Sequence, residues 1–565
     1  MYNIKNLLTQ LTNYKKEFIF ANIIAILAVM VSTPAPLLIP LLVDEVVLQK
    51  KGWLVSSIDA VFSGHHEASF YVLVVFIMTI TLRALFFVLS IWQNYIFTKI
   101  SQDIVFGMRK RLLKHLEKLD LKDYERFTSA KVSSLMVVDL ATVEGFLSTS
   151  ISKFIISVLT VLGVGAVLMA IDWRLALFIL FLNPLIVFFT TRLAKKVGKI
   201  KREENRLIQS FSEALNETLD FYEQVRVSNK GEHFFDGLRK KAREIKDVAV
   251  EFRYKSDASG KFSFLLFLSG FELFRAVGIM MVLYSGLTIG LMLAVFGYLW
   301  VIMTPIQEII NIQYAYHNAK EALKRINELF ELDSEQEVQN AIDPFKNTQT
   351  NSIKVENLFF SYDDKKDVLK GVSLEFEKGK LSAIIGGSGS GKSTLAKLLV
   401  GFYLPKSGLV MIDGVSYHDI GLDNIRENIF LVLQNPTLFN NTLRYNLTFG
   451  EDVSEDRLKK AIEIAQLESV VAKLEDGLDT KIGKGGVNLS GGERQRVSIA
   501  RMIVKDPNIV ILDESTSALD SLTESKLFDG LMEYLKEKTT IIIAHRLSTI
   551  EKADRVYELK EGRLV

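Results

Sequence analysis

The chain contains the segment Leu381-Ser382-Ala383-Ile384-Ile385-Gly386-Gly387-Ser388-Gly389-Ser390-Gly391-Lys392-Ser393-Thr394. Its apolar start predicts a buried strand, and the residues from Lys392 to Val400 predict a helix. Between these elements the glycines let backbone N–H groups converge on phosphate oxygens, and the start of the helix adds a positive dipole. Lys392 is expected to reach the β- and γ-phosphates of a nucleotide, and Ser393 is expected to ligate Mg²⁺. We therefore predict a phosphate-binding loop between a strand and a helix.

A second apolar strand, Ile509–Leu512, ends in two carboxylates, Asp513 and Glu514. Beside a phosphate-binding loop, Asp513 is placed to hold Mg²⁺, directly or through water, and Glu514 to polarise the attacking water as a general base. Two solvated carboxylates at the end of a strand are the alternative. Further strand-like runs alternate with helical ones and predict a mainly parallel α/β core with some antiparallel strands: Ile353–Phe360, Val372–Phe376, Leu381–Gly386 and Thr539–Ile543.

The first half of the chain is far more apolar than the second. Hydrophobic residues make up 49% of the 565 residues, and the mean hydropathy is +0.22. A chain of this length is expected to form at least two domains. A bilayer core requires roughly 20 apolar residues, and only a helix satisfies its own backbone there. Six predicted spans meet this requirement: Phe18–Leu42, Tyr71–Tyr95, Ile151–Ile171, Leu175–Leu193, Phe262–Tyr284 and Ile289–Ile310.

The loops between the spans differ sharply in length and charge. The second and fourth loops are long and basic, whereas the turns after spans three and five are short and nearly uncharged. The positive-inside rule therefore places both termini, the long loops and the C-terminal half in the cytoplasm, in a multi-pass protein of the cytoplasmic (inner) membrane. Helical periodicity on both sides of the boundary predicts that the spans continue as helices into the cytosol.

Three charged residues, Arg83, Glu272 and Arg275, lie inside predicted spans. Because a charge near the bilayer centre costs about 2.5–3.5 kcal/mol on insertion scales, these residues either line a cavity, form a local ion pair or reach the interface. Prolines are expected to kink or loosen spans one, four and six. The chain has no cysteine, which excludes disulfides and thiolate sites, and its net charge of +2 gives no reason to expect a nucleic-acid partner.

Taken together, these motifs resemble those of an exporter-type half-transporter of the ABC superfamily, in which six membrane helices are fused to one nucleotide-binding domain. The segment Leu489-Ser490-Gly491-Gly492-Glu493 is similar to that family's signature loop. The resemblance implies that the loop caps the γ-phosphate of ATP bound by the opposite subunit, with hydroxyl and backbone donors from Ser490, Gly491 and Gly492. The fifth residue is usually Gln, and Glu493 is a variant that we expect to be harmless.

The resemblance assigns roles to further residues, all in the C-terminal half. Tyr362 matches the aromatic residue that stacks on adenine. Gln434 matches the glutamine that contacts Mg²⁺ and water, and His545 the histidine that contacts the γ-phosphate. The catalytic set implied is thus Glu514, His545 and Gln434. The segment Ser517-Ala518-Leu519-Asp520 matches the D-loop, which bridges the two subunits.

In the membrane half, the resemblance covers two cytoplasmic regions that couple ATP binding to the helices. Residues 124–139 resemble the first coupling-helix region, and residues 217–225 resemble the second. Two departures affect coupling rather than ATP binding. Lys131 stands where the family often has Gly, and Gly483-Lys484-Gly485-Gly486 replaces the usual Gly-Glu-Arg-Gly ahead of the signature loop.

The expected organisation is an α-helical transmembrane domain at 1–330, a linker at 331–350 and an α/β nucleotide-binding domain at 351–565. The resemblance implies ATP-driven export or flipping of an amphipathic substrate by a dimer, with ATP and Mg²⁺ as the groups bound. A drug, a lipid, a lipid-linked saccharide and a peptide all remain open as substrates, and a heterodimer remains an alternative to a homodimer. An importer, or an ATP-gated channel or regulator, built on the same fold is the second hypothesis. A soluble ATPase of the superfamily is the third, and the spans argue against it.

Overall fold

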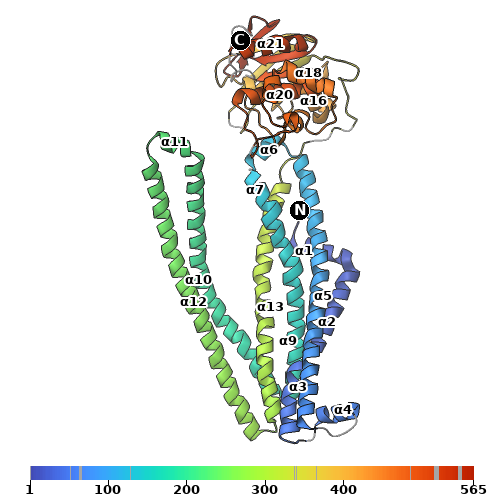
Figure 1. Ribbon diagram of the computed structural model, residues 1–565, viewed down its shortest axis with the longest axis vertical. Coiled ribbons are helices and arrows are strands. Elements are labelled where there is room, and N and C mark those ends of the chain that lie inside the picture. The colour runs from blue at the N-terminus through green and yellow to red at the C-terminus, as the bar shows by residue number, and fades with distance from the viewer. Residues whose placement is uncertain are drawn as a thin grey trace. The chain divides into compact units, whose positions relative to one another are not determined.

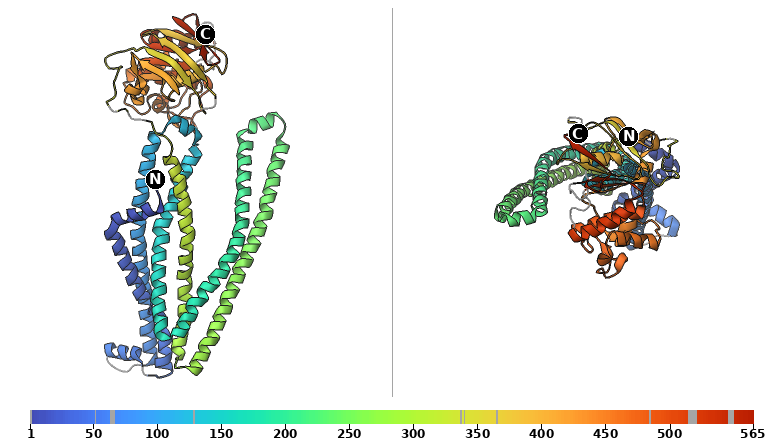
Figure 2. Two further views of the ribbon diagram at one scale, coloured as in Figure 1. Left: turned by 180° about the vertical axis from the view of Figure 1, so that it is seen from behind. Right: turned by 90° about the horizontal axis from the view of Figure 1, so that it is seen from above.

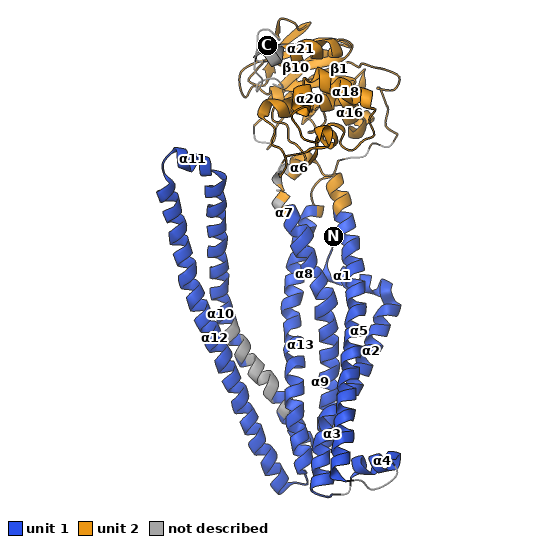
Figure 3. Cartoon of the chain, viewed as in Figure 1, with its two compact units in different colours: residues 1–112, 132–329 blue, residues 113–131, 330–565 orange. Residues whose placement is uncertain are grey.

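The computed structural model describes residues 2–50, 52–62, 67–127, 129–335, 338, 340–363, 366–483, 485–513, 521–544 and 550–565. Within its helices, the side chains of residues 125, 126, 130, 179, 180, 182–188, 190, 191, 193, 194 and 521–525 are not described. The chain divides into two compact units (Figure 3). Unit 1 comprises residues 1–112 and 132–329, and unit 2 comprises residues 113–131 and 330–565.

Unit 1 is helical throughout its described part. Short 3₁₀ or π segments connect some of its helices, at Thr12–Tyr14, Val43–Val47, Leu135–Asp139 and Phe146–Ser150. The helices are α1 (Ile4–Leu11), α2 (Lys15–Ser32), α3 (Ala35–Leu42), α4 (Trp53–Phe62), α5 (Ala68–Glu117), α7 (Ser129–Ser134), α8 (Leu140–Gly145), α9 (Ile151–Ile171), α10 (Trp173–Asp220), α11 (Tyr222–Val227), α12 (Gly231–Tyr284) and α13 (Ile289–Phe330).

Among the described residues, five helical stretches are long and apolar enough to cross a membrane. They are 4–47, 68–117, 131–171, 231–284 and 289–330, and they contain five of the six predicted spans. The remaining one, Leu175–Leu193, lies in α10, where many side chains are not described, so this span stays a prediction. The 50 residues of α5 extend over roughly 75 Å, more than twice the thickness of a bilayer core, as expected for spans that continue as helices.

The prolines of the predicted spans have different effects. The first span is interrupted between Ser32 and Ala35, because Pro34 cannot donate a backbone hydrogen bond and its ring crowds the preceding turn. By contrast, α13 runs without interruption through Pro305.

The helices of unit 1 pack together at one end and separate at the other. At the packed end, α9, α10, α12 and α13 share an apolar cluster in which Phe274 and Tyr298 are fully buried. Away from this end, α10 and α12 continue side by side to α11, and this hairpin diverges from α5, α9 and α13 (Figures 1 and 2). Since α11 belongs to a long basic loop, the open end is the one predicted to face the cytoplasm.

Two buried carboxylates hold α13 near its two ends. Asp44 accepts hydrogen bonds from the Thr288 hydroxyl and, at 3.0 Å, from the Gly290 N–H in the first turn of α13. Asp139 forms an ion pair with Arg325 near the other end, with an Nη2–Oδ1 distance of 2.5 Å. Each carboxylate is at most 5% exposed, so both contacts fix the helix within unit 1.

The charges predicted inside spans lie on the surface of the single chain. Glu272 and Arg275 form an ion pair of 2.9 Å one turn apart on α12, with side chains 62% and 47% exposed. Arg83 is also exposed, on α5. The arrangement fits a local pair as well as it fits a cavity lining, and the cavity role stays a prediction.

Unit 2 contains the mixed α/β core that the sequence predicts. A six-stranded sheet has the order β12-β11-β3-β10-β9-β6, and its strands are parallel except for β12. A four-stranded antiparallel sheet has the order β2-β1-β4-β5, and β7 pairs with β8. The strands are β1 (Ile353–Phe360), β2 (Leu369–Phe376), β3 (Leu381–Ile385), β4 (Ser407–Ile412), β5 (Val415–Ser416), β6 (Ile429–Val432), β7 (Asn441–Thr442), β8 (Lys481–Ile482), β9 (Ile509–Asp513), β10 (Thr539–Ile543), β11 (Arg555–Lys560) and β12 (Arg563–Leu564).

Helices lie between these strands, and the buried apolar residues of unit 2 form two clusters. One cluster joins the antiparallel sheet to the helix that follows β3, and the other surrounds the long helix that precedes β9. The helices are α6 (Leu121–Arg126), α14 (Lys392–Leu399), α15 (Tyr417–Ile420), α16 (Leu422–Asn428), α17 (Leu443–Thr448), α18 (Glu455–Ile464), α19 (Glu468–Val471), α20 (Gly491–Lys505) and α21 (Ser521–Leu535), with a 3₁₀ turn at Gly477–Asp479.

Residues 113–131 fold with unit 2, although the sequence analysis placed them in the membrane half. The Asp120 N–H donates to the carbonyl of Asp333 at 3.1 Å, and the Asp333 N–H donates to the Asp123 carboxylate at 2.9 Å. Leu121 packs against the core cluster of the antiparallel sheet. The first predicted coupling region thus begins inside unit 2.

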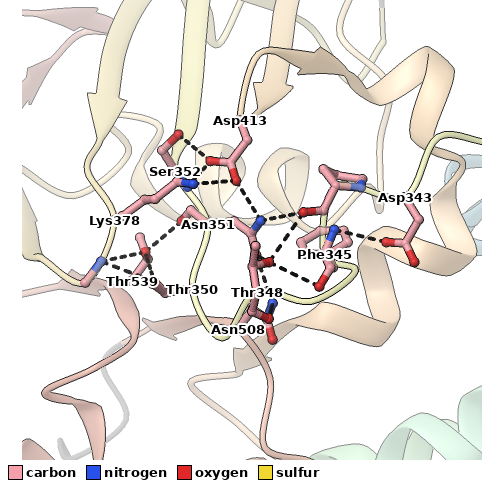
Figure 4. A network of polar contacts seen from close by, with 12 residues as sticks. Asp343, Phe345, Thr348, Thr350, Asn351, Ser352, Lys378, Asp413, Asn508 and Thr539 are labelled. Atoms are coloured by element: carbon pink, nitrogen blue, oxygen red, sulfur yellow. Dashed lines mark hydrogen bonds and ion pairs between the residues drawn. The ribbon is translucent and has the colours of Figure 1, made fainter.

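The end of the predicted linker is built into unit 2 by a polar network (Figure 4). The fully buried Asn351 donates to the carbonyl of Pro344 at 2.9 Å and to the Asp413 carboxylate at 2.8 Å, and accepts from Asn508 at 2.9 Å. The Thr539 hydroxyl donates to the carbonyl of Asn351 at 2.7 Å. These bonds fix the segment before β1 to the starts of β9 and β10.

Asp413→Asn is expected to destabilise unit 2. The carboxylate also accepts from the N–H and hydroxyl of Ser352, each at 2.9 Å, and pairs with Lys378 at 2.8 Å. Losing the charge should lower the free energy of unfolding by about 1–3 kcal/mol, which corresponds to a fall in Tm of about 2–10 °C for a unit of this size. Asn tolerates the left-handed backbone at this position (φ 48°), so the backbone is unchanged. Thermal unfolding of the full chain measures the loss, with the exposed Asp419→Asn as the control.

Asp413 should also make the stability of unit 2 depend on pH. Burial raises the pKa of Asp413, but hydrogen bonds from Lys378, Ser352 and Asn351 outweigh it and leave the pKa below the usual value. The stabilisation is therefore present above the unfolded pKa, near 4, and is lost as the pH falls through the lower folded pKa. A variant that unfolds at the same temperature as the parent at pH 7 would contradict this assignment.

Candidate nucleotide-binding site

Four parallel strands of the six-stranded sheet end at the same edge. Ile384 of β3 pairs with Ile543 of β10, Ile543 pairs with Asp513 of β9, and Leu512 of β9 pairs with Val432 of β6. The segments that leave this edge carry the phosphate-binding loop and Gln434. Of the other predicted residues, Glu514 and Ser517–Asp520 follow β9 in sequence and His545 follows β10, but all of them lie outside the described residues.

Two glycines, Gly386 and Gly391, have backbone conformations in the loop between β3 and α14 that strain any other residue. Gly386 has a φ of 145°, and a Cβ atom there would lie 2.1 Å from the carbonyl oxygen of Leu559. Gly391 has a φ of 104°, and its Cβ atom would lie 2.7 Å from Leu369. The loop therefore packs closely against β11 and the start of β2, where there is no room for a Cβ atom.

Lys392 bridges this loop. It is 6% exposed, and its Nζ atom donates to the carbonyls of Gly386 at 2.9 Å and Gly387 at 3.0 Å. Two neutral carbonyls are weak partners for an ammonium group, so a phosphate that enters the loop can take over these bonds. The ammonium group and the glycine-lined loop together fit a polyphosphate.

The residues available for Mg²⁺ are hard oxygen ligands. Ser393 lies in the first turn of α14, and Asp513, 7% exposed, ends the strand β9. No group of three or more His, Asp or Glu side chains that could hold a metal occurs among the described residues. Mg²⁺ usually binds through one or two carboxylates together with substrate phosphates, so these oxygen ligands fit it.

Gly386→Ala is expected to abolish nucleotide binding, because the added methyl group collides with the backbone of β11 and the loop must shift. Gly387→Ala is the matched control, since a Cβ atom there has no neighbour within 4 Å. Thermal unfolding with and without ATP measures the effect: the control should keep the stabilisation by ATP and Gly386→Ala should lose it. Equal stabilisation of both variants would show that the loop tolerates the shift.

Tyr362 lies beside the start of α14. Its hydroxyl is 3.1 Å from the hydroxyl of Thr394, and its ring packs edge-on against Phe360 and Tyr403. This places an aromatic ring next to the phosphate-binding loop. Its stacking on adenine stays a prediction.

The predicted signature loop forms the start of α20. Ser490 is the N-cap residue, and its hydroxyl accepts the Glu493 N–H at 3.3 Å. In return the Glu493 carboxylate accepts the Ser490 N–H at 2.7 Å and the Ser490 hydroxyl at 2.9 Å, which completes a capping box. Burial raises the pKa of Glu493, but the hydrogen bonds from Ser490, together with the charges of Arg496 and Lys473, outweigh it and lower the pKa below its usual value. Lys484, in the departure ahead of this loop, lies outside the described residues.

Two features of this region were not predicted from the sequence. The buried Gln495 donates to the carbonyl of Gln434 at 3.3 Å, so α20 contacts the backbone of the predicted Mg²⁺-contacting glutamine. Both residues line a cavity of about 470 Å³ together with Asn435, Asn488 and Arg494. No pattern in the sequence pairs these side chains, because they lie 61 positions apart.

The other unpredicted feature is the buried guanidinium of Arg501, on the same helix. It donates to the carbonyl of Asn446, to the Asn446 side chain at 2.8 Å and to the carbonyl of Thr437 at 3.0 Å. Burial lowers its pKa to about 10, so the group stays charged at neutral pH. Arg501 lines a second cavity, of about 230 Å³, whose other side chains include Phe402, Arg426, Phe430, Phe449 and Lys505.

Comparison with protein families matches both halves of the chain. A family described as the ABC transporter transmembrane region matches residues 18–306, and one described as ABC transporter matches residues 369–517. The second match includes the phosphate-binding loop, Gln434, the signature loop, Asp513 and Glu514.

Individual proteins match over most of their length. An ATP-dependent lipid A-core flippase from Legionella pneumophila (strain Paris) is 31% identical over 86% of this chain and 82% of its own. An uncharacterised ABC transporter ATP-binding protein, YwjA, from Bacillus subtilis (strain 168) is 34% identical over 84% of this chain and 82% of its own. The structure of a bacterial Atm1-family ABC exporter with ATP bound covers 98% of this chain and 94% of its own, with a TM-score of 0.76 and 26% identity.

Proposed function

The chain belongs to the ABC transporter family, as an exporter-type half-transporter with an ABC ATPase, and from this premise we propose that two identical copies use ATP to flip an amphipathic lipid across the cytoplasmic membrane. The relatives named as lipid A-core flippases favour a lipid over a drug or a peptide. The basic loops favour a cytoplasmic position for unit 2 and both termini.

The proposed dimer rests on one observation: in the described part of one chain, the phosphate-binding loop and the signature loop are not bonded to each other. The phosphate-binding loop leads into α14, in one apolar cluster, whereas the signature residue Leu489 belongs to the other. Among the described residues, no hydrogen bond or ion pair joins Leu489–Glu493 to Gly386–Thr394. Both half-sites are present in each chain, so two copies placed head to tail make two complete sites.

Within each site, the residues divide the work of phosphoryl transfer. Lys392 and the loop N–H groups bind the phosphates, and Ser490 of the second copy closes over the γ-phosphate. Ser393, Asp513 and Gln434 would hold Mg²⁺, which neutralises phosphate charge when bound. Glu514 orients the attacking water as general base, and His545 contacts the γ-phosphate. In the family's mechanism, ATP closes the two nucleotide-binding units and hydrolysis lets them part, which alternates the access of the membrane cavity.

The helix α11 supports a contact that would transmit this closure. Phe221 and Tyr222 are about half exposed at its start, between the carboxylates of Asp220 and Glu223. The cavity beside Arg501 has aromatic walls, three cationic side chains and Glu451. Arg426 and Lys505 form ion pairs with Glu335 and Glu427, whereas among the described residues Arg501 forms none. Aromatic and acidic groups fit such a cavity, so we assign α11 of one copy to this cavity of the other.

Replacing both Phe221 and Tyr222 by Ala is expected to reduce lipid flipping about tenfold or more, because exposed aromatic anchors carry much of the affinity of a docked surface. ATP binding by unit 2 should be unchanged, since these residues lie in unit 1. The matched control is Phe234→Ala, which removes an equally exposed ring from α12 outside α11. Equal flipping by the variant and the control would exclude α11 as the coupling contact.

Reconstitution into liposomes that contain a fluorescent phospholipid tests the proposed function. The chain alone should move the label between leaflets with ATP and Mg²⁺, and Glu514→Gln should not. ATP-dependent uptake of a solute would favour an importer, and an ATP-dependent ion current would favour a channel. If the label moves only when a second, different chain is present, the transporter is a heterodimer and not a homodimer.

A further inference from the structure

Glu493 occupies the donors of Ser490 in the isolated chain. Its carboxylate accepts both the N–H and the hydroxyl of Ser490, at 2.7 and 2.9 Å. Both bonds lie within the first turn of α20, a helix of 15 residues whose N-terminus favours negative charge. The carboxylate therefore stands where an incoming anion would find its hydrogen bonds.

We propose that Glu493 is a positioning residue that competes with the γ-phosphate of ATP for Ser490, and so sets the ATP concentration at which two copies close. The inference rests on the proposed function, which gives the Ser490 hydroxyl to the γ-phosphate bound by the other copy. The hydroxyl has a single hydrogen. It must leave the carboxylate before it can donate to the phosphate.

The charge of Glu493 adds to this competition. Among the described residues, no cation lies within ion-pair distance of the carboxylate, and the nearby Arg496 donates instead to the carbonyl of Gln466 at 2.7 Å. Arg496 and Lys473 act on the carboxylate only from beyond ion-pair distance. When the two copies close, the carboxylate and a phosphate anion share a site from which water is excluded. Like charges repel more strongly there than in water.

Glutamine at this position would keep the fold and remove the charge. Its amide oxygen can accept the Ser490 N–H, so the capping box survives, whereas a neutral amide holds the hydroxyl more weakly than a carboxylate does. Glu493→Gln thus separates the proposed competition from the capping of α20. Glu493→Ala removes both and serves as the structural control.

The test measures closure of the nucleotide-binding units against ATP concentration. Because the chain has no cysteine, Lys460→Cys, exposed on α18, gives one spin label per copy of the chain in lipid nanodiscs. The parent carries Glu514→Gln so that hydrolysis does not reopen the units. The distance between the two labels then reports closure as ATP is added.

We expect Glu493→Gln to lower the ATP concentration at half-closure about tenfold, the size of effect that removing one close like charge produces. The binding of ADP, which has no γ-phosphate, should be the same in parent and variant. Glu493→Ala should lower the half-closure concentration less than Glu493→Gln does, because it also removes the half of the capping box that Glu493 supplies to the start of α20. In the presence of Ser490→Ala, the change at 493 should have a smaller effect, because the contested hydroxyl is gone and only the repulsion between the charges remains.

The results distinguish this inference from the function on which it rests. If the parent never closes with ATP, the proposed dimer mechanism fails. If the parent closes but Glu493→Gln closes at the same or a higher ATP concentration, Glu493 does not compete with the phosphate. A tighter affinity for ADP in the variant would also overturn the proposal, because the effect would then not depend on the γ-phosphate.

Discussion

Replacing Glu514 by Gln is expected to lower the rate of ATP hydrolysis by about 10²–10⁴, the usual contribution of a general base. The residue directly follows Asp513, which ends β9 at the carboxyl edge of the six-stranded sheet. There β9 pairs with β10, and β10 pairs with β3, the strand before the phosphate-binding loop. Glutamine has the same shape but cannot accept a proton from the attacking water. Binding of ATP should survive, because no phosphate contact is assigned to this side chain.

The measurement is the steady-state ATPase rate of the purified chain in lipid nanodiscs. Glu537→Gln, which makes the same change on the exposed surface after α21, is the matched control and should hydrolyse ATP at the parent rate. Stabilisation against heat by ATP should be equal in all three proteins. Undiminished hydrolysis by Glu514→Gln would assign the base to another residue.

Lys392→Ala is expected to remove both binding and hydrolysis. The ammonium group is the only cation that the structure places across the described phosphate-binding loop, and it lies within 3.0 Å of two loop carbonyls. Loss of one such charge-assisted donor costs about 10²–10³ in rate at sites of this kind, and the affinity for ATP falls with it. Unlike Glu514→Gln, this variant should lose its thermal stabilisation by ATP.

Lys397→Ala provides the comparison within the same helix. Lys397 lies in the last turn of α14, where its ammonium group is 5.8 Å from the ring centroid of Tyr403. The Lys397→Ala protein should bind and hydrolyse ATP as the parent does. If Lys392→Ala kept its ATP stabilisation, the phosphates would have to be bound by the loop N–H groups alone.

The elements that the sequence predicts best are those with a local signal. The strands Ile353–Phe360 and Thr539–Ile543 occur at their predicted bounds, because their apolar patterns end at residues that leave the sheet. The break at Pro34 also follows from one residue. The capping box of Ser490 and Glu493 has a local signature too, S-x-x-E, which would have shown that the variant residue touches the serine.

Contacts between distant residues could not be predicted in this way. The pair of Gln495 with Gln434, and the bonds of Asn351 with Asp413 and Asn508, join segments that only the fold brings together. The grouping of residues 113–131 with unit 2 is of the same kind, since helical periodicity says nothing about which core Leu121 enters. The family resemblance supplied the roles of the ATP-site residues, but it could not show that Glu493 holds the Ser490 hydroxyl.

The hairpin of α10 and α12 has a mechanical consequence. Its base is fixed in the apolar cluster that contains Leu175, and its free tip, α11, follows the 48 residues of α10. At 1.5 Å per residue this lever arm is roughly 70 Å long, so each degree of rotation at the pivot moves the tip by about 1.2 Å. A swing of about ten degrees, small enough for side chains at the pivot to accommodate by sliding, carries α11 about 12 Å. A small, stiff movement at the pivot would thus become a large displacement at the end of the hairpin that the charge pattern predicts to be cytoplasmic.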